Sequence, residues 1–117
     1  MKLVLNKAYA QLGDSILNFV VSAGLTFALK KPCGIKVADK ILRRIITKEE
    51  ILSIVEKTVF TEMEKEDILE ALIAYAWLKG IVSIDELIEE AAKGADVEES
   101  TKRVLSKIVH KLKVKLT

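Results

Sequence analysis

The sequence is poor in cysteine, histidine and aromatic residues, and each shortage excludes a class of structure or site. Its 117 residues include one cysteine, Cys33, which excludes an internal disulfide and a multi-cysteine zinc site. The single histidine, His110, fits no visible Ser-His-Asp pattern, so we expect it at the surface. Aromatic residues make up only 5% of the chain, so aliphatic side chains must dominate the core. The lone cysteine also fits a reducing compartment, and we expect a cytoplasmic protein.

Alternating apolar and polar runs, the pattern of half-buried strands, are also absent. Half of the residues are apolar, which is enough for residues 1–117 to fold as a single domain. Four helix-start signals of the form Ser/Thr/Asp-x-x-Glu begin at Thr47, Thr61, Ser83 and Asp96. We therefore predict an all-α fold, a helical bundle.

Two segments, residues 16–29 and 68–78, are apolar almost all round, as are helices in the middle of a bundle. The longest apolar run ends at Leu29 and contains polar residues, so it is too short to span a bilayer comfortably. We expect no membrane partner, and no signal peptide because the N-terminus turns polar at Asn6. The helices expected from these patterns cover residues 3–11, 14–29, 35–46, 47–57 and 61–78, with two more after Ser83 and Asp96.

Three carboxylates lie at the edge of, or inside, the two apolar segments. Asp14 follows Gly13, which marks a bend or a close approach, and stands at the expected start of a helix. Asp67 and Glu70 are three residues apart, so they share one helix face, and Glu70 is surrounded by Ile, Leu and Ala. Buried carboxylates that face one another repel unless a cation lies between them. The three predict a divalent metal site, although Asp14 could be only a helix cap and Asp67 part of an exposed acidic turn.

The net charge of +2 hides an uneven distribution: residues 1–46 carry +6, residues 47–100 carry −10 and residues 101–117 carry +6. A basic surface for a polyanion beside an acidic, metal-binding pole would produce this pattern, and ordinary solvated helix faces explain it equally well. The basic residues after position 101 are our second candidates for phosphate contacts. The first candidates share one face of the helix expected over residues 35–46: Lys36, Lys40, Arg43 and Arg44.

Two motifs resemble those of the catalytic domain of the ribonuclease III family. The first is Leu-Gly-Asp-Ser over residues 12–15, and the second is Asp-x-x-Glu-Ala-Leu-Ile over residues 67–73. The resemblance covers about residues 5–90. It implies a ribonuclease III-like helical bundle that hydrolyses double-stranded RNA with Mg²⁺ or Mn²⁺ and acts as a homodimer. It also implies that the catalytic and metal-binding residues are Asp14, Asp67 and Glu70.

The sequence departs from the family pattern four residues before the signature Asp14, where the family usually has a glutamate and this chain has Ala10. The aromatic residue that commonly follows is replaced by Gln11. The compact branch called Mini-III also lacks the glutamate, and we expect a catalytic-domain-only protein of that kind, without a double-stranded-RNA-binding domain. The missing acid leaves two alternatives open: a non-catalytic RNA-binding or dimerisation module with the same fold, and an unrelated helical adaptor.

Overall fold

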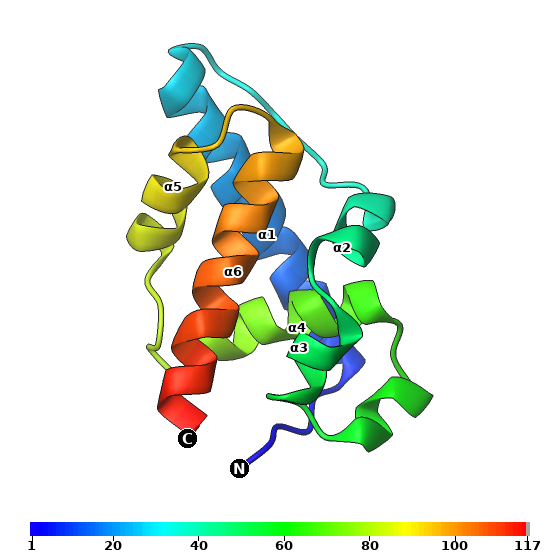
Figure 1. Cartoon of the computed structure of the whole chain (residues 1–117). Coiled ribbons are helices and arrows are strands. Elements are labelled where there is room, and N and C mark those ends of the chain that lie inside the picture. The colour runs from blue at the N-terminus through cyan, green and yellow to red at the C-terminus, as the bar shows by residue number, and fades with distance from the viewer. Residues whose placement is uncertain (117) are drawn as a thin grey trace.

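The computed structural model describes residues 1–116, and the all-α prediction is confirmed: this part of the chain forms helices and no β-strand (Figure 1). The only extended pairing among these residues is an isolated bridge between Leu3 and Val55. The elements in chain order are α1 (Lys7–Leu29), α2 (Asp39–Ile45), α3 (Lys48–Leu52), the 3₁₀ helix η1 (Lys57–Thr61), α4 (Lys65–Leu78), α5 (Ile84–Ala92) and α6 (Val97–Leu116).

Helix α1 is one unbroken helix of 23 residues, where the sequence predicted two segments separated at Gly13. Asn6 caps it, because its side-chain oxygen accepts hydrogen bonds from the backbone N–H groups of Ala8 and Tyr9. Gly13 does not interrupt the helix. Instead it lets α1 approach α4, since a Cβ at this position would overlap the backbone oxygen of Glu70. Asp14 therefore lies inside α1, and the expectation that it starts or caps a helix is wrong.

The centre of the molecule is the packing of α1 against α4, with α5 and α6 completing the core (Figure 1). In α4, Ile68, Leu72 and Ile73 are fully buried, so the prediction of a central apolar helix is confirmed there. In α1 it holds for one face only, because Phe19 and Phe27 remain 57% and 68% exposed. By length and composition α1 could also cross a membrane, and its other face packs in the core of the protein.

The segment before α2 is extended, and the helix predicted over residues 35–46 is wrong in its first part. Side chains of α1 hold this segment: Asn18 accepts a hydrogen bond from the N–H of Val37 at 2.8 Å, and Ser22 from that of Ile35 at 2.8 Å. These tertiary bonds replace the ones that a helix would have made within itself. Lys36 consequently lies outside α2.

Three other boundaries differ from the sequence predictions. Residue Leu3 is extended rather than helical, because it exchanges backbone hydrogen bonds with Ile54 and Glu56 at 2.7 and 2.8 Å. Helix α4 begins at Lys65, where Glu64 and Asp67 form its capping box, and not after Thr61. The helix expected to reach residue 57 ends at Leu52, which makes α3 a short element. The starts of α5 and α6, after Ser83 and Asp96, agree with the predictions.

Candidate functional site

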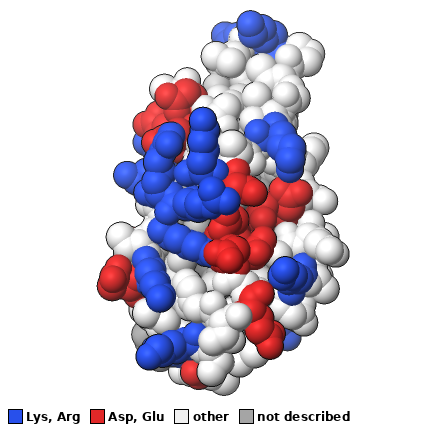
Figure 2. All heavy atoms as spheres, turned by 90° about the vertical axis from the view of Figure 1, so that its right-hand side faces the viewer, with Lys and Arg blue, Asp and Glu red and all other residues white. Residues whose placement is uncertain are grey.

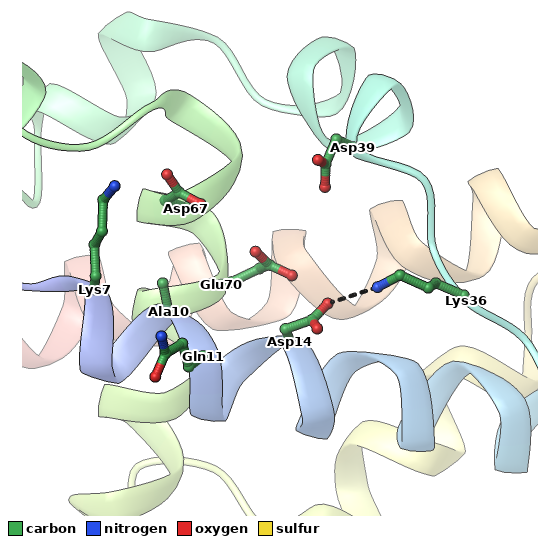
Figure 3. Close-up of a pocket in the computed structure, with 8 residues that line it drawn as sticks. All are labelled: Lys7, Ala10, Gln11, Asp14, Lys36, Asp39, Asp67 and Glu70. Carbon is green, nitrogen blue, oxygen red and sulfur yellow. Dashed lines mark ion pairs between the residues drawn. The ribbon is translucent and has the colours of Figure 1, made fainter.

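A hollow of about 330 Å³ opens where α1 and α4 meet, below the start of α2 (Figure 3). Its wall is dominated by charged side chains, four of them carboxylates and two of them lysines. All three acidic residues singled out by the sequence are in it, and they come from two different helices. The lining residues are Lys7, Ala10, Gln11, Asp14, Lys36, Asp39, Asp67 and Glu70.

Glu70 is the most buried carboxyl group of the hollow. It is only 6% exposed, and it stands on α4 between residues that pack in the core. Burial raises the pKa of Glu70 to about 8, with further contributions from a hydrogen bond to Asp14 and from the charges of Asp14, Asp39 and Asp67. Without a cation, Glu70 therefore holds a proton at neutral pH.

Asp14 has the opposite electrostatic behaviour. Its pKa lies below the usual range, first because of the hydrogen bond with Glu70 and then because of the nearby Lys36, while burial opposes the shift. The Lys36 ammonium lies 3.5 Å from an Asp14 oxygen (Figure 3), and the Asn18 amide donates to the same oxygen at 3.2 Å. Because Asn18 also accepts from the N–H of Val37, one side chain orients Asp14 and fixes the segment before α2.

Asp67 has a structural role that the acidic-turn alternative partly anticipated. One of its oxygens accepts a hydrogen bond from the backbone N–H of Glu64 at 3.3 Å, which caps the start of α4. The residue is nevertheless half-buried, and its side chain lies at the wall of the hollow (Figure 3). Capping uses one oxygen of Asp67, so the other oxygen can face the hollow.

The donor set fits a hard divalent cation, because such ions take carboxylate oxygens and the hollow carries more negative than positive side chains. Residues 1–116 contain no group of three or more His, Cys, Asp or Glu already arranged to hold a metal ion directly. Asp14, Asp67 and Glu70 thus share one hollow without forming a closed set of direct ligands. An open set of this kind suits Mg²⁺, which keeps several of its waters when bound.

Two residues of the hollow were not foreseen from the sequence: Asp39, the first residue of α2, and Lys7, the first residue of α1. Asp39 stands among basic neighbours in the chain and carries no motif. Its place at the hollow depends on the extended segment that leads into α2. No signal in the sequence identified that segment, so only the tertiary structure reveals Asp39.

The sequence predicted that the four basic candidates share one helix face. Lys36 lies outside α2, whereas Lys40, Arg43 and Arg44 lie on it at helical spacing. Lys36 pairs with Asp14, Arg43 lies 2.5 Å from a Glu66 oxygen, and Arg44 pairs with Glu98. Lys40 is exposed on α2. On the side of the molecule where α2 lies, a group of Lys and Arg side chains borders a group of Asp and Glu side chains (Figure 2). His110 is exposed, as expected.

Comparison with known proteins agrees with this architecture. A protein-family model described as Ribonuclease III matches residues 7–117, which is nearly the whole chain. Comparison with curated proteins gives no match. The match spans both motifs, the hollow that they line and every helix of the fold. The chain therefore belongs to the ribonuclease III family.

Proposed function

We propose that this chain is a cytoplasmic, metal-dependent endoribonuclease that hydrolyses phosphodiester bonds of double-stranded RNA. Membership of the ribonuclease III family indicates an RNA-related nuclease function. The observation that carries the finer proposal is the buried carboxyl group of Glu70 beside Asp14, at a hollow with an excess of acid. Burying one carboxyl group against another costs stability, and a cation bound between them offsets that cost.

Asp14, Asp67 and Glu70 would hold Mg²⁺ or Mn²⁺, the first and last directly and Asp67 directly or through a water. The bound ion would polarise the scissile phosphate, lower the pKa of a water and stabilise the leaving oxygen. Glu70 would hold the ion as a carboxylate, because the cation would offset both the burial and the neighbouring negative charges. Asn18 keeps the Asp14 carboxylate aimed at the hollow through its 3.2 Å hydrogen bond.

Two lysines at the wall of the hollow would contact a phosphate of the RNA. Lys36 is exposed on its extended segment, and its 3.5 Å pair with Asp14 is weak enough to exchange for an RNA phosphate. Lys7 starts α1, beside Ala10 and Gln11. Both side chains are flexible ammonium groups, so they can hold a backbone phosphate near the metal site without reading the base sequence.

The basic residues of α2 would extend this contact along the duplex. Lys40 is exposed, while Arg43 and Arg44 are held by Glu66 and Glu98. A guanidinium has five N–H donors, so an arginine bound to one carboxylate can still donate to a phosphate. Duplex RNA is recognised mainly through its shape and backbone, which such contacts provide.

We propose a homodimer, with two sites acting on opposite strands. The face of α1 that does not enter the core exposes Leu12, Phe19 and Phe27, and the end of α4 adds Leu78. Leu12 and Leu78 line one shallow depression of the surface, so the two helices contribute to a common apolar area. Apolar areas of this kind are typical of protein–protein interfaces, and a second copy would cover it.

A non-catalytic RNA-binding or dimerisation module is the second candidate, and Ala10 is the observation that favours it. Without a carboxylate at this position the site has one negative charge fewer than the family pattern provides. The retention of Asp14, Asp67 and Glu70 around one hollow favours the enzyme, because a module without a metal has no use for these charges together.

The test is the cleavage of a labelled, fully paired RNA at low salt, with Mg²⁺ or with EDTA. We expect cleavage by the wild type only with Mg²⁺, and a loss on the order of a hundredfold in Glu70→Gln. Glu89→Gln, an exposed position on α5 outside the hollow, is the matched control and should retain full activity. Equal cleavage by wild type and Glu70→Gln would indicate a contaminant. Salt-sensitive binding without cleavage would support the non-catalytic module.

A further inference from the structure

Asp39 is the carboxylate of the hollow to which no motif assigns a role. It is the first residue of α2, so it reaches the hollow from the side opposite the α1 backbone, where Ala10 lies (Figure 3). Its side chain points toward the space between Glu70 and Lys36 in this view. Its negative charge acts on Glu70, which places the two carboxyl groups in one electrostatic environment.

Two of the cations near Asp39 are bound to other carboxylates. Lys36 pairs with Asp14, and Arg43 is bound to Glu66 at 2.5 Å. The charge of Asp39 also helps to raise the pKa of Arg43. Among the described residues, Asp39 itself forms no ion pair. Asp39 is exposed to solvent and lines the hollow, so its carboxylate is available to a cation bound there.

Resting on the proposed function, we propose that Asp39 is the fourth carboxylate of the metal site and replaces the glutamate that is missing at Ala10. With all groups ionised, the hollow holds Asp14, Asp39, Asp67 and Glu70 against Lys7 and Lys36, a net charge of −2 that one divalent cation balances. A hydrated cation accepts negative charge through its waters, so the carboxylate does not have to come from the same helix as the missing glutamate. Asp39 thus acts as a positioning residue for the metal.

The first test measures the binding of Mn²⁺ alone by isothermal titration calorimetry. We expect Asp39→Asn to weaken Mn²⁺ binding about tenfold, as removal of outer-shell carboxylates typically does. Asp85→Asn is the matched control, because Asp85 is also an exposed residue in the first turn of a helix but lies away from the hollow. Circular dichroism checks that each variant is folded. Equal affinities in Asp39→Asn and Asp85→Asn, or no Mn²⁺ binding by the wild type, would overturn the proposal.

The second test asks whether the two positions replace one another. Asp39→Glu keeps the charge and should keep Mn²⁺ affinity within about threefold of the wild type. Adding Ala10→Glu to Asp39→Asn should recover most of the lost affinity, since it restores the charge from α1. A folded double variant that binds Mn²⁺ no better than Asp39→Asn would overturn the replacement.

These measurements separate the role of Asp39 from the proposed function. A wild type that binds Mn²⁺ in an Asp39-dependent way but cuts no paired RNA would remove the nuclease proposal and leave the role of Asp39 intact. A wild type that cuts RNA, together with unaltered Mn²⁺ binding by Asp39→Asn, would remove the role of Asp39 alone.

Discussion

Asp14 and Glu70 share a hydrogen bond that moves their pKa values in opposite directions. Burial on α4 raises the pKa of Glu70 and favours its protonated form, whereas the pKa of the more exposed Asp14, beside Lys36, is lowered and favours its ionised form. The pair therefore holds one proton between two carboxyl groups when no cation is present. The protonation of Glu70 therefore affects both the stability of the fold and the binding of a cation by this pair.

The first prediction concerns the stability of the metal-free protein against pH. The pKa of Glu70 is raised from 4.5 to about 8, so the native state binds a proton that the unfolded state has lost. Stability from this group is complete below pH 4.5 and is lost as the pH rises to about 8. We expect the free energy of unfolding in EDTA to fall by on the order of 1 kcal/mol per pH unit in this window.

Urea unfolding measures this decline. The range from about pH 5 to about pH 9 is chosen to bracket the pKa of Glu70. In Glu70→Gln the decline should disappear, because the amide does not titrate. Saturating Mg²⁺ should also flatten it in the wild type, because the cation binds the ionised form. A Glu70→Gln variant with the same pH dependence as the wild type would show that another group is responsible.

The second prediction tests the close approach of α1 to α4 at Gly13. A methyl group there would overlap the backbone of Glu70, so Gly13→Ala must push the two helices apart. We expect a loss of stability of about 3 kcal/mol and a loss of metal binding, because the separation also moves Asp14 from Glu70. Gly34→Ala is the control, since a Cβ at Gly34 meets no atom within 4 Å. Thermal unfolding of both variants measures the loss of stability, and similar melting temperatures in the two would argue against the close contact.

The third prediction concerns the oligomeric state. Sedimentation equilibrium at micromolar concentration should give twice the 13.0 kDa mass of one chain. Phe19→Glu places a charge on the exposed apolar face of α1 and should yield monomers. Val4→Glu changes a residue that is 73% exposed outside that face and should leave the dimer intact. A wild type that sediments as a single chain would contradict the proposed interface.

The fourth prediction separates the basic residues by their existing partners. Lys40 is exposed and forms no ion pair among the described residues, whereas Arg44 is bound to Glu98. We expect Lys40→Ala to reduce the slope of log affinity against log salt for duplex RNA by about one unit. Lys2→Ala, an exposed lysine near the N-terminus, is the control and should leave the slope unchanged. An unaltered slope in Lys40→Ala, measured by fluorescence anisotropy, would place the RNA elsewhere.

Local signals in the sequence were sufficient for much of this fold. The caps at Ser83 and Asp96 start α5 and α6 because each side chain accepts a hydrogen bond from an N–H three residues later. The continuous apolar pattern of α4 requires a buried position. The two motifs together indicated the ribonuclease III family, and the resemblance predicted that Asp14, Asp67 and Glu70 belong to one site. The caps and the apolar pattern depend on residues that are close in the chain, whereas the joint site of the two motifs was expected from the family resemblance.

The sequence by itself thus determined the all-α class, the central position of α4 and the three acidic residues of the hollow. Tertiary structure decided the rest: the unbroken course of α1 through Gly13, the extended segment at Val37 and the arrival of Asp39 at the hollow. Each of these depends on hydrogen bonds or close packing between residues far apart in the chain. Helix periodicity and capping describe only neighbours within a few positions, so they carry no information about such contacts.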